Sequence, residues 1–122
     1  MKANELMIGD WVYNTHNRQP EQVCETREHM VMLAYNDLYD YDEIEPIPLT
    51  SDILERNGFE KVQNLLVLQW ENGVYPSKIF VEYNPENYCL FINDMMFPKP
   101  VRFLHELHHI LMDCGIEKEI TL

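Results

Sequence analysis

In residues 100–116 the sequence reads PVRFLHELHHILMDCGI, which predicts the longest helix of the chain. Pro100 suits a first helical position, where a missing N–H costs nothing, and Gly115 suits the left-handed residue just past the end. Ile116 could then fold back on Leu111 or Met112. A helix turns by about 100° per residue, so the apolar side chains of this segment lie on one face, which we expect to be buried. That face holds Phe103, Leu104, Leu107, Ile110, Leu111 and Cys114.

The opposite face of this helix contains a His-Glu-x-x-His pattern. His105 and His109 lie one turn apart and could hold a zinc ion, with Glu106 as the base that activates a bound water. Such a site needs a third protein ligand, and Met112 stands where the glycine of an extended metzincin motif would be. Asp113 is on the same straight helix and cannot converge well on the ion. The favoured interpretation is therefore a solvated polar face, with a small zinc peptidase or hydrolase as the alternative.

Composition favours an ordinary globular domain. The chain has 122 residues, 46% hydrophobic and 11% aromatic, which predicts a single domain over 1–122 with a strand-rich subregion at 1–49 and a second one at 50–122. The net charge of −12 argues against direct binding of nucleic acid or anionic lipid, because both interactions depend on Lys and Arg. No signal peptide or membrane-spanning run is recognisable, and three well-separated cysteines suit a reducing compartment, so we expect a cytoplasmic protein.

The distribution of short strands predicts an α+β fold. Strands near residues 8–13, 22–26, 30–34 and 42–47 would form a small SH3-like β-barrel or a strongly curled sheet. Thr50 is a good N-cap for a short linking helix, Ser51 to Arg56, which Asn57-Gly58 would end. A second, antiparallel sheet follows at residues 65–71, 78–83 and 88–93, with turns at Asn72-Gly73 and 84–87, and we expect the C-terminal helix to cover it.

One segment of the N-terminal subregion is rich in tyrosines and carboxylates. Its candidate partner-binding residues are Tyr35, Asp37, Tyr39, Asp40, Tyr41 and Asp42. Calcium is a poor match, because the spacing lacks the alternating acids and the turn glycine of an EF-hand loop. Tyrosines beside acids can form a protein-binding patch, since a tyrosine supplies contact area at low entropic cost. The simpler interpretation is a solvated loop whose tyrosines cap the barrel.

Three stretches carry a resemblance to a family of short uncharacterised proteins of gut-anaerobe bacteria, their phages and mobile elements. They are MKANELMIGDWVY at 1–13, IEPIPLTSDILERNGF at 44–59 and VRFLHELHHILMDCGIEKEI at 101–120. Members of that family often have other residues where this chain has His105 to His109. The family has no established activity, so the resemblance implies a context and no mechanism.

Two classes of function follow from these observations. The leading hypothesis is a noncatalytic protein-interaction domain without a cofactor, which binds an unknown protein partner through its strand-rich N-terminal half. It rests on the missing phosphate-binding glycine loop, nucleophile elbow and paired catalytic acids. An acidic DNA mimic is a variant, which would need the carboxylates of residues 37–45 on one surface. The zinc-dependent hydrolase is the opposing class.

Overall fold

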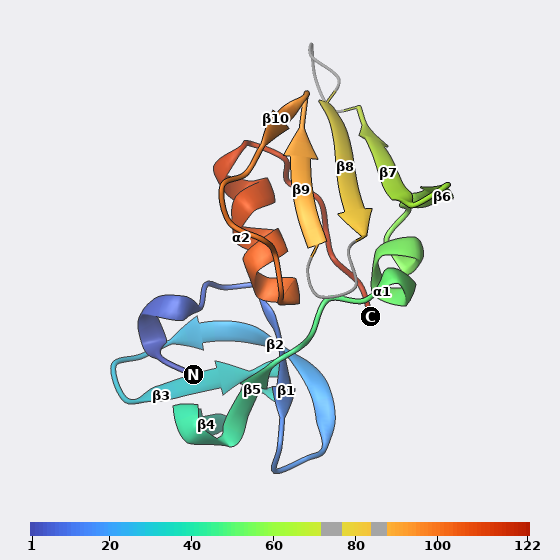
Figure 1. Ribbon diagram of the computed structural model, residues 1–122. Coiled ribbons are helices and arrows are strands. Elements are labelled where there is room, and N and C mark those ends of the chain that lie inside the picture. Colours follow the sequence, from blue (N-terminus) through green and yellow to red (C-terminus); the bar gives the residue numbers. More distant parts are fainter. Residues whose placement is uncertain (72–76, 84–87) are drawn as a thin grey trace. The chain divides into compact units, whose positions relative to one another are not determined.

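The computed structural model describes residues 1–71, 77–83 and 88–122, which form two compact units of an α+β protein (Figure 1). Unit 1 comprises Met1–Pro48 and Phe103–Ile110, and unit 2 comprises Leu49–Arg102 and Leu111–Leu122. The first boundary falls one residue before the predicted subregion boundary at residue 49. The sequence did not indicate that Phe103–Ile110 belongs with the N-terminal strands.

Unit 1 is built on an antiparallel sheet of five strands in the order β4-β3-β2-β1-β5. The strands are β1 (Trp11–Asn14), β2 (Gln19–Thr26), β3 (Met30–Leu33), β4 (Leu38–Asp40) and β5 (Ile44–Pro46), and short 3-10 helices occupy Ala3–Glu5 (η1), Ala34–Asn36 (η2) and Tyr41–Glu43 (η3). The sheet is not a closed barrel, because β4 and β5 are its outer strands. Strand β4 lies where a loop was predicted, so that prediction was wrong.

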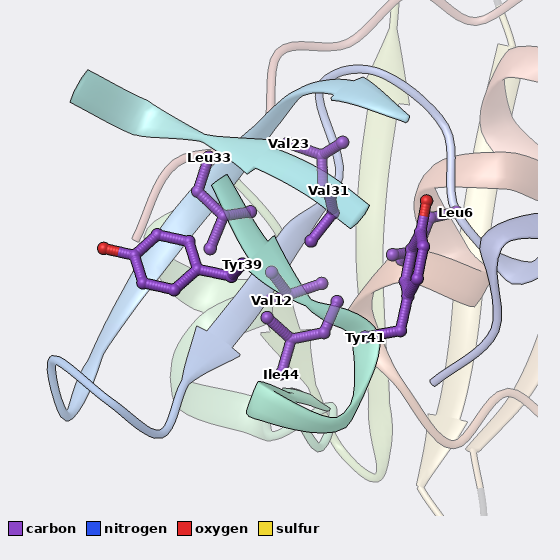
Figure 2. Close-up of a cluster of buried hydrophobic side chains, with 8 residues drawn as sticks. All are labelled: Leu6, Val12, Val23, Val31, Leu33, Tyr39, Tyr41 and Ile44. Atoms are coloured by element: carbon purple, nitrogen blue, oxygen red, sulfur yellow. The ribbon is translucent and has the colours of Figure 1, made fainter. Parts of the chain in front are cut away.

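The core of unit 1 forms where alternate strand residues point to one side of this sheet. In β1, Val12 and Asn14 are buried while Trp11 and Tyr13 are only partly covered, which is the period of two that a strand imposes. Figure 2 shows the buried cluster, with Tyr39 and Tyr41 at its two ends. Its members are Leu6, Val12, Val23, Val31, Leu33, Tyr39, Tyr41 and Ile44. Each fully buried aliphatic side chain of this size contributes about 1.5 to 3 kcal/mol, so the cluster stabilises unit 1 substantially.

Unit 2 contains a second antiparallel sheet of five strands, in the order β10-β9-β8-β7-β6. The strands are β6 (Glu60–Val62), β7 (Leu65–Trp70), β8 (Ser77–Tyr83), β9 (Tyr88–Ile92) and β10 (Met95–Met96). The pairing of Tyr83 with Tyr88 and of Ile79 with Ile92 confirms the predicted β8–β9 hairpin. The predicted turns at Asn72-Gly73 and 84–87 lie outside the described residues. The outer strands β6 and β10 were not predicted.

The short helix α1 (Ser51–Arg56) begins and ends where the sequence predicts. The Thr50 hydroxyl accepts a hydrogen bond from the Ile53 N–H at 3.2 Å, as an N-cap does. Gly58 has a φ of +92°, and the Phe59 N–H donates to the Leu54 carbonyl at 3.1 Å. This bond satisfies a helix-end carbonyl and brings the Phe59 side chain into the core of unit 2.

Helix α2 spans Leu104–Asp113, so the predicted start at Pro100 was wrong. Val101 and Phe103 instead make β-bridges to Tyr88 and Pro48, and these backbone pairings override the helix preference of the segment. No helix in the described ranges is long and apolar enough to cross a membrane.

The C-terminal end of α2 agrees with the prediction. Gly115 has a φ of +76°, its N–H donates to the Met112 carbonyl at 3.0 Å, and the Ile116 N–H donates to the Leu111 carbonyl at 2.8 Å. These two bonds are the Schellman pattern. Cys114, which was predicted to be buried, is exposed, because the helix has already ended at that residue. Coverage of the second sheet by this helix stays a prediction.

Candidate functional site

The His-Glu-Leu-His-His segment of α2 lies against Asp10, a residue that the sequence analysis did not select. The Asp10 side chain is 0% exposed, and its two oxygens contact two histidines. His108 Nδ1 is 2.6 Å from Oδ1, and His109 Nε2 is 2.6 Å from Oδ2. The Met7 N–H donates a third hydrogen bond to Oδ2 at 2.9 Å. We call Asp10, His108 and His109 the Asp–His cluster.

A tight turn before β1 places Asp10 in this position. The Asp10 N–H donates to the Met7 carbonyl at 3.1 Å, and the Gly9 N–H donates to the Val23 carbonyl at 2.8 Å. Gly9 has a φ of +95°, and a Cβ atom there would lie 3.4 Å from Cε1 of His108. The backbone conformation therefore favours glycine, whereas a Cβ atom would make an ordinary van der Waals contact with the imidazole.

The electrostatics of the cluster favour an ionised aspartate. Burial raises the pKa of Asp10, but the hydrogen bonds from His108 and His109 and from the Met7 N–H together lower it below the usual value. Burial lowers the pKa of the neighbouring His105, and the nearby His109 adds to this, although Asp10, Glu106 and Glu5 act in the opposite direction. Two imidazole nitrogens and one backbone N–H thus surround both oxygens of this carboxylate.

The predicted zinc ligands take structural positions. His109 Nε2 faces Asp10, and the His105 ring stacks on Phe103 with centroids 5.9 Å apart. His105 is 7% exposed, so the prediction of a solvated face was wrong at this residue. Its Nδ1 is buried, with no hydrogen-bond partner among the described residues. Within residues 1–71, 77–83 and 88–122 no three His, Cys, Asp or Glu side chains are placed to hold a metal ion.

Glu106, the predicted catalytic base, caps its own helix. Its Oε1 accepts a hydrogen bond from the Phe103 N–H at 2.9 Å. This bond satisfies a backbone donor just before the first turn, in the same way as the glutamate of a capping box. This bond gives Glu106 a structural role, and its role as a catalytic base stays a prediction.

The tyrosines of the candidate partner-binding segment belong to the core of unit 1. Tyr39 and Tyr41 are each 9% exposed. The Tyr39 hydroxyl accepts from Asn17 Nδ2 at 2.9 Å, and the Tyr41 hydroxyl donates to the Arg27 carbonyl at 2.6 Å. These two rings therefore offer little surface to a partner, and Tyr39 lies in strand β4 rather than in a solvated loop that caps a barrel.

The acids of that segment differ from the two buried tyrosines, and the side chain of Tyr35 lies outside the described part of the structure. The backbone of Tyr35 lies in η2. Asp37, Asp40 and Asp42 are exposed, and their role in binding stays a prediction.

The second sheet has an apolar row on the side opposite its buried face. The buried face holds Leu66, Leu68, Ile79, Val81, Leu90 and Ile92. On the other side, strand pairing joins Val67 to Phe80, Phe80 to Phe91 and Phe91 to Met96. The first three of these side chains are half-buried, and Met96 is 59% exposed. Leu65 lies on the same side of the sheet, and we call this side the open face.

A shallow depression of about 340 Å³ lies on the open face. It is lined by Leu65, Phe80, Glu82, Phe91 and Asp94. Lys78 Nζ lies 4.9 Å from the centre of the Phe80 ring. Alternation in the sequence predicts the buried side of these strands, and Phe80, Glu82 and Phe91 alternate with those buried residues on the other side.

Comparison with known proteins gives no relative, since no family model, curated protein or solved structure matches the chain.

Proposed function

We propose that this chain is a noncatalytic protein-interaction domain whose contact surface is the open face of the second sheet. The observation that carries the proposal is the row formed by Val67, Phe80, Phe91 and Met96, four apolar side chains in register across four adjacent strands. An antiparallel sheet with one solvated side normally alternates apolar and polar residues, so this side should be polar. Apolar patches that stay in water mark interaction surfaces.

The edge of the open face strengthens the proposal. Met95 and Met96 in β10 are 72% and 59% exposed. Methionine is flexible and polarisable, and is used at surfaces that adapt to a partner. The two residues follow the Asn93-Asp94 turn, whose φ angles of +50° and +68° allow a two-residue hairpin. A tight turn thus holds the exposed Met96 beside the aromatic row, whereas Met95 pairs with Ile92 and belongs to the other side of the sheet.

A noncatalytic role agrees with the Asp–His cluster. Asp10, His108 and His109 hydrogen-bond to one another, and Glu106 caps α2. Asp10, His108, His109 and Glu106 therefore each have a structural role in unit 1. We place the contact surface in unit 2 rather than in the N-terminal half, because Tyr39 and Tyr41 are buried.

We further propose that unit 1 is an SH3-like fold. The support is the strand order β4-β3-β2-β1-β5 and the single 3-10 turn, Tyr41–Glu43, between the last two strands. A cytoplasmic location is part of the same proposal, since Cys24 and Cys114 are exposed free thiols, which persist best in a reducing compartment.

Selection of a random peptide library on the immobilised chain tests the proposed function. The wild-type protein should enrich a set of related peptides, and Phe91→Thr should lose them, because threonine suits a strand but removes the aromatic contact. Leu38→Thr is a matched control, since Leu38 is an exposed apolar strand residue of unit 1. No enrichment, or the same enrichment by the wild type and Phe91→Thr, would contradict the proposal.

A further inference from the structure

The depression on the open face combines an apolar floor with two acidic side chains. Leu65, Phe80 and Phe91 provide the apolar part, and Glu82 and Asp94 the carboxylates. Glu82 lies on β8 opposite Leu65 and Cys89, in the row next to the aromatic pair. Asp94 lies in the turn after β9. Both carboxylates are exposed.

We infer that the open face binds a basic apolar segment of a partner protein, with a Lys or Arg of that segment beside Glu82 and Asp94. This inference rests on the proposed function and names the chemistry of the partner. Apolar residues of the segment would cover Leu65 and the Phe80–Phe91 pair. Its cationic side chain would meet the two carboxylates.

The protein itself shows that an ammonium group suits this surface. Lys78 Nζ already lies 4.9 Å from the Phe80 ring centre, within the range of a cation–π contact. The aromatic row therefore tolerates a cation beside it. Lys78 is the basic residue of β8, while Glu82 and Asp94 supply the depression with two negative charges.

The net charge of the chain favours a basic partner over a second copy of the chain on the open face. Each molecule carries a net charge of −12, so a second copy would approach the open face against strong repulsion. A basic partner would be attracted over a longer range, which raises its association rate and makes the rate depend on salt. The acids at the depression and the charge of the chain thus favour the same partner.

Isothermal titration of the full chain with short peptides tests the inference. Three peptides alternate leucine with lysine, glutamine or glutamate, so that only their charge differs. The lysine peptide should bind about three- to tenfold more tightly than the glutamine peptide, and the glutamate peptide most weakly, since each exposed ion pair adds a modest factor. Added salt should reduce the difference.

Charge variants of the chain separate the local carboxylates from the net charge. Glu82→Gln together with Asp94→Asn should lower the affinity for the lysine peptide about three- to tenfold and leave the glutamine peptide unchanged. Glu28→Gln together with Glu45→Gln removes the same charge from exposed positions of unit 1 and should have little effect. Equal losses in the two double variants, or equal binding of all three peptides, would overturn the inference.

Failure of the inference alone can be distinguished from failure of the proposed function. If all three peptides bind equally and Phe91→Thr still weakens them, the open face is an interaction surface without a preference for cations. If Phe91→Thr changes nothing, or no peptide binds, the proposed function fails with the inference.

Discussion

Replacing Asp10 by asparagine should strongly destabilise unit 1. The carboxylate is 0% exposed and accepts hydrogen bonds from His108, His109 and the Met7 N–H. Hydrogen bonds to a charged group contribute about 1.5 to 3 kcal/mol each, and breaking a buried polar pair costs about 3 to 5 kcal/mol. Asparagine keeps the shape and one acceptor oxygen, but it turns an NH₂ group toward one of the donors. We therefore expect the free energy of unfolding to fall by about 2 to 4 kcal/mol.

Urea denaturation near neutral pH measures this change, with Asp42→Asn as the control. Asp42 is exposed, so its replacement should stay within about 0.5 kcal/mol of the wild type. A loss below about 1 kcal/mol for Asp10→Asn would refute the argument that the Asp–His cluster holds unit 1 together.

The pH dependence of the same comparison adds a second check. The pKa of Asp10 is lowered in the folded protein, so its contribution to stability is present above the unfolded value of about 3.9 and is lost as the pH falls through the lower, folded value. The difference between the wild type and Asp10→Asn should therefore persist at about pH 5 and close only below about pH 4.

Two further predictions concern α2. The pKa of His105 is lowered by burial, so below about pH 6.5 the unfolded chain binds a proton that the folded chain does not, and stability falls. His105→Phe removes this effect, and thermal melts should show its stability rising relative to the wild type between about pH 7.5 and 5.5, whereas a constant difference would speak against it. Gly115→Ala should lower the free energy of unfolding by about 1 kcal/mol in urea titrations, because φ is +76°, although no described residue other than the chain neighbours lies within 4 Å of the new Cβ. An unchanged free energy of unfolding would contradict this prediction.

Elements whose signals are local could be predicted from the sequence. The limits of α1 follow from Thr50 and from Asn57-Gly58, and the end of α2 follows from Gly115, because caps and left-handed residues act within one turn of the chain. The β8–β9 pairing follows from alternation in two neighbouring strands. In each case the residues that decide the structure are close in sequence.

Features that depend on distant residues could not be predicted. Asp10 and His108 are 98 positions apart, and nothing near Asp10 indicates a histidine partner. The start of α2 depends on bridges from Val101 and Phe103 to Tyr88 and Pro48, which are distant in sequence. Strand β4 has only three residues and is recognisable mainly by its pairing with β3. The open face is an intermediate case. The alternation in β7, β8 and β9 is visible in the sequence, but the apolar character shared by the outward residues Val67, Phe80 and Phe91 gains meaning only from their pairing.

Chemical-shift mapping tests the central claim most directly. The isotope-labelled full chain would be titrated with the peptide that the library selection enriches most strongly, and backbone amide shifts followed along the sequence. The account predicts that the changes concentrate in β7 to β10, around Val67, Phe80, Phe91 and Met96. Changes that concentrate in the strands of unit 1, or are absent at saturating peptide, would contradict it.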